Sequence, residues 1–162
     1  MNTVLMVLLV LSNAAAQASV PRPVRVAGPG YEGAIVSAEE LLASDPQHLL
    51  KPSDVWTPSE GDIREAEQLL PEYVKSLAAS ATLRGTRIPA ELARYYRQYL
   101  GRLSKGERVV SIQFFHAESS VGKEGLWHEG LFGVMGGGEQ FFRVTYHVET
   151  KRFSGLQVNA PE

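Results

Sequence analysis

Residues 107–116 read ERVVSIQFFH, and this stretch decides the fold. Apolar side chains recur at every second position, at Val110, Ile112 and Phe114, which is the period of a strand with one buried face. Three further segments with strand-like patterns follow the first, at residues 126–135, 140–149 and 152–158. Short strands joined by tight turns predict an antiparallel meander sheet.

A helix is predicted before the sheet, because Thr57-Pro-Ser-Glu60 has the pattern of a capping box. Threonine stands at the N-cap, Pro58 at the first helical position and Glu60 at the third. Apolar residues then recur every three or four positions as one stripe: Ile63, Ala66, Leu70, Val74 and Leu77. The helix is expected to end near Ala81, with a kink at Pro71.

The segment between this helix and the sheet predicts a short helix from Pro89 to about Tyr95, and then a strand. We therefore predict an α+β fold, in which a long N-terminal helix packs on a four- to five-stranded antiparallel meander sheet. Residues 57–162 are expected to form this single domain.

The N-terminal part of the chain has two predicted regions. Residues 1–18 carry no charge and contain the apolar run VLMVLLVL, followed by Ala16-x-Ala18, which indicates a signal peptide. The alternative is a buried N-terminal strand or helix, because the usual basic start is missing. Residues 19–56 are rich in proline and glycine and predict an extended arm and loop with a short helix at Ser37–Ala43.

Composition narrows the function classes. The chain has 16 Lys and Arg against 18 Asp and Glu, so it lacks the basic character that nucleic acids or anionic membranes require. It has no cysteine, hence no disulfide and no site for a lipid anchor. We expect an exported protein, periplasmic or extracellular, with no membrane span after signal cleavage.

The strand register predicts which side chains share a face. With residues 136–138 as a hairpin turn, one face should form the core under the helix: Val110, Ile112, Phe114, His116, His128, Phe132, Val134, Phe142, Val144, Tyr146 and Val148. The other face should be half aromatic and half polar: Phe115, Trp127, Leu131, Phe141 and Met135 beside Gln113, Glu129, Arg143, Thr145 and His147. A slip of one residue would exchange the two sets.

The stretch 114–130, FFHAESSVGKEGLWHEG, contains two histidines that the predicted register brings to one face. His116-x-Glu118 matches part of a zinc deaminase motif, but that motif also needs cysteines. His128-Glu129 begins like the zinc-protease motif, yet Phe132 stands in place of its second histidine. His116 and His128 are therefore weak metal candidates, since zinc sites need three or four ligands, and no motif predicts a cofactor.

Several short motifs resemble an uncharacterised family of small exported bacterial domains. These are W-T-P-S-E-x-D-I, Y-x-R-Q-Y-x-G, V-x-x-x-Q-F-F, G-G-G-x-x-F-F-x-V-x-Y and F-x-x-L-x-V-N, which together cover Trp56 to Asn159. The resemblance implies no activity and transfers no catalytic residue. By analogy, the predicted order of elements is similar to cystatin-like folds.

Three functions are weighed. The first is a non-enzymatic binding domain that engages an envelope or extracellular protein or peptide through the aromatic outer face, with contacts from Phe115, Trp127, Glu129, Arg143 and His147. The competing interpretation is that this face is covered by the chain itself. The second function is a hydrolytic or metal-dependent enzyme that uses His116 and His128 with Glu118 or Glu129. The third is a structural envelope component, which predicts a stable oligomer.

Overall fold

The structure is a computed structural model that describes residues 21–45 and 47–161. The predicted signal peptide, residues 1–18, lies outside the described residues. Within the described ranges, no helix is both long and apolar enough to cross a membrane.

The chain contains four α-helices and seven strands among its described residues. In chain order they are β1 (Val24–Gly28), β2 (Tyr31–Val36), α1 (Ala38–Ala43), β3 (Val55–Trp56), α2 (Glu60–Ser76), α3 (Ile88–Glu91), β4 (Tyr95–Ser104), β5 (Glu107–His116), α4 (Ser120–Lys123), β6 (Phe141–His147) and β7 (Arg152–Val158). Short 3₁₀ turns add Pro52–Asp54, Leu92–Arg94, Leu126–His128 and Gly138–Gln140.

The predicted α+β class is confirmed, but the sheet is larger than expected and mixed. Its seven strands follow the order β1-β2-β4-β5-β6-β7, and β3 pairs with β4 beside this path. β2 and β4 run parallel, whereas the other pairs are antiparallel. The prediction of a purely antiparallel meander with four to five strands is therefore wrong.

The additional strands come from the segment that was predicted as an extended arm, residues 19–56. β1 and β2 form a hairpin through Pro29-Gly30, where Gly30 has a φ of +77°, a value that glycine adopts without strain. In β2, Ala34, Ile35 and Val36 are all buried, on both faces of the sheet. A strand covered on both faces shows no alternation of polar and apolar residues, so the period-two pattern was absent there.

The long helix begins slightly later than the capping pattern indicated. Ser59, not Thr57, is the N-cap of α2: its Oγ accepts from the backbone N–H of Asp62 at 3.2 Å. The Asp62 carboxylate accepts from the backbone N–H of Ser59 at 2.9 Å, which completes a capping box. The helix ends at Ser76, ahead of the predicted end, and Pro71 lies inside it.

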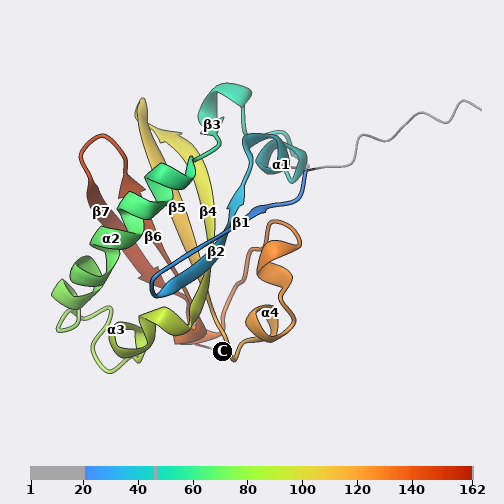
Figure 1. Ribbon diagram of the computed structural model, residues 1–162. Coiled ribbons are helices and arrows are strands. Elements are labelled where there is room, and N and C mark those ends of the chain that lie inside the picture. The colour runs from blue at the N-terminus through green and yellow to red at the C-terminus, as the bar shows by residue number, and fades with distance from the viewer. Residues whose placement is uncertain (1–20, 46, 162) are drawn as a thin grey trace, which may run out of the picture.

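The main core lies between α2 and one face of the sheet. Figure 1 shows α2 lying across β5, β6 and β7, while the segment that contains α4 lies on the far side of β2 and β4. The apolar stripe of α2 is buried through Ile63, Ala66, Leu70 and Val74. The predicted core residues of β5 and β6, and the residue after β6, are buried with it: Val110, Ile112, Phe114, Phe142, Val144, Tyr146 and Val148.

The predicted strand at residues 126–135 is wrong. This stretch instead forms a 3₁₀ turn and a loop, and the longer covering segment, residues 119–140, passes over the face of the sheet away from α2, which we call the outer face. Apolar side chains of this segment, including Trp127, pack onto the sheet from outside, but the segment is not one of its strands. As a result, Phe132 and Val134 pack on the outer face, and His128 does not join the core beneath α2.

A buried charge pair connects α2 to the sheet. The Nε of Arg97, on β4, lies 3.3 Å from Oε1 of Glu67, on α2, and the two side chains are 1% and 4% exposed. Among the described residues this Nε has no directed hydrogen bond, so the contact is an ion pair. The hydroxyl of Tyr99 donates to Glu67 Oε1 at 2.8 Å. Burial raises the pKa of Glu67, and the nearby Arg97 guanidinium opposes that shift.

Candidate functional site

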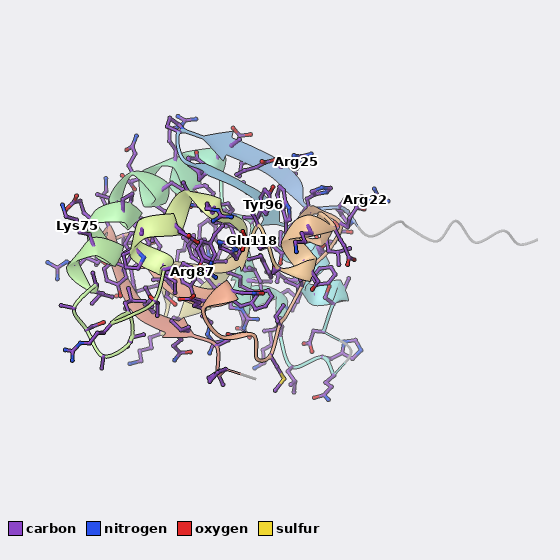
Figure 2. The ribbon with its side chains drawn as sticks, turned by 90° about the horizontal axis from the view of Figure 1, so that it is seen from below. Arg22, Arg25, Lys75, Arg87, Tyr96 and Glu118 are labelled. Atoms are coloured by element: carbon purple, nitrogen blue, oxygen red, sulfur yellow. The ribbon has the colours of Figure 1, made fainter. Side chains whose placement is uncertain are left out.

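The aromatic residues predicted to form a half-exposed face are buried. Phe115 and Trp127 are each 2% exposed, and Phe141 is 8% exposed. The Trp127 ring stacks on Tyr96 with centroids 4.6 Å apart. The prediction that these aromatic side chains form a half-exposed face is wrong, because Trp127 on the covering segment packs down onto the sheet and is buried in one cluster with Phe115 and Phe141. Figure 2 shows Tyr96 close to this segment, and Arg25 on β1.

The amide of Gln98 fastens the covering segment to the outer face. This side chain is completely buried. Its Nε2 donates to the carbonyl oxygens of Trp127 at 2.7 Å and Gly130 at 2.6 Å, while its Oε1 accepts from the backbone N–H of Phe132 at 3.1 Å. One side chain thus satisfies three backbone groups that would otherwise be buried without partners.

A second buried polar group lies where α1 meets the covering segment. Glu40 is 3% exposed, and its Oε2 has no hydrogen-bond partner among the described residues. Burial raises the pKa of Glu40, and a hydrogen bond from the backbone of Leu131 partly opposes this shift. Ionising this buried carboxylate therefore costs stability in the folded state.

Replacing Glu40 by glutamine is expected to raise the free energy of unfolding at pH 7, because the amide keeps an acceptor for Leu131 and carries no charge. The raised folded-state pKa means that the charge penalty is present above that pKa and disappears as the pH falls through it towards the unfolded value. The gain should therefore vanish below about pH 4, where both states bind the proton.

Urea unfolding across this pH range measures the effect. Glu39→Gln, an exposed neighbour on α1, is the matched control and should change little. A stability difference for Glu40→Gln that stays constant with pH would contradict the assignment.

The part of the outer face beyond the covering segment is polar and hollowed. A hollow of about 400 Å³ is lined by residues from β4, β5, β6 and β7: Leu100, Arg102, Ser111, Gln113, Arg143, Thr145, Gly155 and Gln157. The strand register explains this set, because Gln113 pairs with Arg143 and Arg143 with Gln157, while Leu100, Ser111 and Thr145 form the adjacent row. Side chains in the two rows point to the same face.

Two arginines give the hollow its charge. Arg102 and Arg143 are both exposed, and within the described part of the chain neither forms an ion pair. Arg143 Nε donates to Gln157 Oε1 at 2.9 Å, which holds the guanidinium over the sheet. The lining contains no aspartate or glutamate. The site can therefore hold an anionic group by charge-assisted hydrogen bonds.

Of the five predicted contact residues, the structure brings only Arg143 into this hollow. His147 lies farther along β6, where its Nε2 is 2.7 Å from Ser154 Oγ. Glu129 lies on the covering segment, where its carboxylate is 3.5 Å from Arg22. The alternating pattern of the sequence indicated the polar side chains of β5 and β6 that line the hollow. Arg102 and Gln157 could be placed there only once β4 was known to pair with β5, and β7 with β6.

The histidines do not form a shared centre. His116 is fully buried: its Nε2 lies 3.0 Å from Glu91 Oε2, and its Nδ1 accepts from the backbone N–H of Glu118 at 3.2 Å. Both ring nitrogens are thus occupied. His128 stands on the covering segment with its Nδ1 3.4 Å from Glu129. In the described ranges, no group of three or more His, Cys, Asp or Glu residues could hold a metal ion.

Glu118 belongs to a surface network of charges instead. The hydrogen bond from Arg94 to Glu118 is 2.6 Å long, and it holds the pKa of Glu118 below its usual value. Arg87 lies 4.0 Å from the same carboxylate, and Figure 2 shows Arg87 and Glu118 beside each other. Because its charge is already balanced by arginines, this carboxylate has the character of a surface ion pair rather than a general acid or base.

Comparison with known proteins adds no assignment, since no family model, curated protein or solved structure matches this chain.

Proposed function

We propose that the chain is an exported, non-enzymatic binding domain that engages an acidic segment of a protein partner through the hollow on its outer face. The observation that carries the proposal is the pair Arg102 and Arg143, two arginines without an ion pair in the described part of the chain, in a hollow without carboxylates. Charge complementarity favours an anionic ligand, since guanidinium groups bind carboxylates with matched geometry.

The neutral lining supports a peptide as the source of the carboxylate. Gln113 and Gln157 carry amides, while Ser111 and Thr145 carry hydroxyls, so the hollow offers donors and acceptors of the kind that peptide groups use. The position of the hollow on a rigid sheet also favours binding, because the strands hold these side chains in place without a rearrangement.

The proposal is tested by titrating the purified protein with an acetylated, amidated peptide rich in glutamate, and with the same peptide carrying glutamine. The glutamate peptide should shift backbone amide resonances of β5 and β6, and the glutamine peptide should not. Arg143→Gln should weaken binding about tenfold or more, because one charge-assisted hydrogen bond contributes about 1.5–3 kcal/mol.

Arg64→Gln is the matched control, since it removes the same charge from an exposed position on α2, on the opposite face. Equal weakening by Arg64→Gln and Arg143→Gln would show attraction to the whole protein rather than to this hollow. Binding of both peptides with the same affinity would also overturn the proposal.

A further inference from the structure

A second, smaller hollow adjoins the first on the outer face. It has a volume of about 110 Å³, and its lining comes from β5, β6, the covering segment and the chain after β7: Gln113, Phe114, Phe115, Gly133, Val134, Phe141, Phe142, Arg143 and Asn159. Gln113 and Arg143 line both hollows. The two hollows therefore meet at these two side chains and form the two halves of one surface.

The halves differ in chemistry. The first carries the second arginine, Arg102, together with hydroxyl groups. The second is bordered by the buried rings of Phe115 and Phe141 and by Val134, which is partly exposed. A ligand that crosses the surface thus meets Arg102 and then the apolar side chain of Val134. The transition follows the strands, since β5 and β6 contribute successive residues to each half.

A fully exposed methionine lies beside the second hollow. Met135 follows Val134 and is 99% exposed, the highest value among the exposed large apolar side chains of the described residues. Asn159 holds the backbone on both sides of it, because its Nδ2 donates to the carbonyl oxygens of Val134 and Gly136, each at 2.9 Å. The methionine side chain is therefore held out on a fixed loop, beside the hollow that Val134 lines.

An exposed, fixed methionine has the properties of an interaction anchor. Its flexible thioether side chain adapts to apolar partners of different shapes. Fixing the loop before binding reduces the entropy lost on association. Singly exposed apolar residues are common on protein surfaces, but this one adjoins a hollow that is itself open on the outer face.

We infer that the ligand is an extended peptide segment that places an acidic residue at Arg102 and Arg143 and an apolar residue against Val134 and Met135. This inference rests on the proposed function and specifies its ligand. The two contact points lie near Thr145 and Phe141 on β6, four residues apart, or about 13 Å at a strand rise of about 3.3 Å per residue. An extended peptide therefore carries the two side chains about four positions apart.

Four acetylated, amidated peptides test the inference by calorimetry on the purified protein. Two carry glutamate and leucine four positions apart, in the two possible orders, joined by serine and glycine. The other two replace leucine by serine. One order of the glutamate–leucine pair should bind about tenfold more tightly than its serine counterpart, since burying a leucine side chain contributes about 1.5–3 kcal/mol.

Met135→Ser should abolish that tenfold gain and leave the affinity for the serine peptides unchanged. Leu49→Ser is the matched control, because Leu49 is an apolar residue that is 74% exposed in the loop between α1 and β3, and it should preserve the gain. Because the Met135 side chain is almost fully exposed to solvent, its replacement should not disturb folding.

The outcomes separate the two proposals. Equal affinity for the leucine and serine peptides, or a leucine gain that survives Met135→Ser, would overturn the inference and leave the acidic site standing. Failure of all four peptides to bind would overturn both proposals. If free acetate bound as tightly as the serine peptides, the hollow would be a site for small anions, and the proposal of a peptide ligand would be overturned.

Discussion

Replacing Gln98 by leucine is expected to lower the free energy of unfolding by about 3 kcal/mol or more. The leucine leaves the carbonyl groups of Trp127 and Gly130 and the N–H of Phe132 without their partner. Each such buried group costs about 1–3 kcal/mol when it remains unsatisfied. Opening of the covering segment limits the loss, because water then reaches the freed groups.

Urea unfolding measures this change, and hydrogen exchange shows where it acts. We expect faster exchange at residues 126–134 in Gln98→Leu than in the parent protein, because these backbone groups open first. Gln113→Leu is the matched control: Gln113 pairs with Gln98 across β4 and β5 but is partly exposed, so its change should stay within about 0.5 kcal/mol. A similar loss in both variants would contradict the role of Gln98.

Glu67→Leu is expected to cost about 3–5 kcal/mol, because it leaves the guanidinium of Arg97 buried without its counter-charge. Tyr99 also loses the acceptor of its hydroxyl. The double variant Glu67→Leu with Arg97→Met should recover most of this loss, since replacing both charges by apolar side chains removes the desolvation penalty of each.

Thermal and urea unfolding of the two single variants and the double variant measure the coupling between these residues. Glu72→Leu, an exposed position on the same helix, provides the control for the loss of one negative charge and should change stability only slightly. A double variant that is no more stable than Glu67→Leu would show that the ion pair does not account for the loss.

The sequence predicted the elements in which polarity follows a simple period. The alternation of Val110, Ile112 and Phe114 correctly indicated β5 and the face that packs under α2. The segment 126–135 also contains apolar residues, but Gly125, with a φ of +70°, turns the chain just before it. Backbone groups of this segment then bond to Gln98 instead of a neighbouring strand. Periodicity alone does not distinguish a strand from a loop that packs on one.

The sequence pattern did not predict which polar side chains are buried. Glu67 lies outside the apolar stripe of its helix, and acidic residues usually face solvent, so the pattern does not predict its burial. Its partner Arg97 and the amide of Gln98 occur in a tyrosine-rich segment, where the pattern indicates a strand but not which polar residue is enclosed. The candidate site was also only partly predictable from the sequence. Arg143 was predicted as a contact residue, whereas Arg102 and Gln157 lie near it only because β4 pairs with β5 and β7 pairs with β6.

The parallel pairing of β2 with β4 also affects the order in which the chain can fold. Between these two strands the chain passes through α1, β3, α2 and α3, so the pairing closes a long loop and loses more chain entropy than the hairpins β4–β5 and β6–β7. The hairpin β1–β2, made early in synthesis, has no neighbour to pair with until residues 95–104 have been translated. We therefore expect the pairing of β2 with β4 to form later than the local hairpins, because non-local strand pairing is slow.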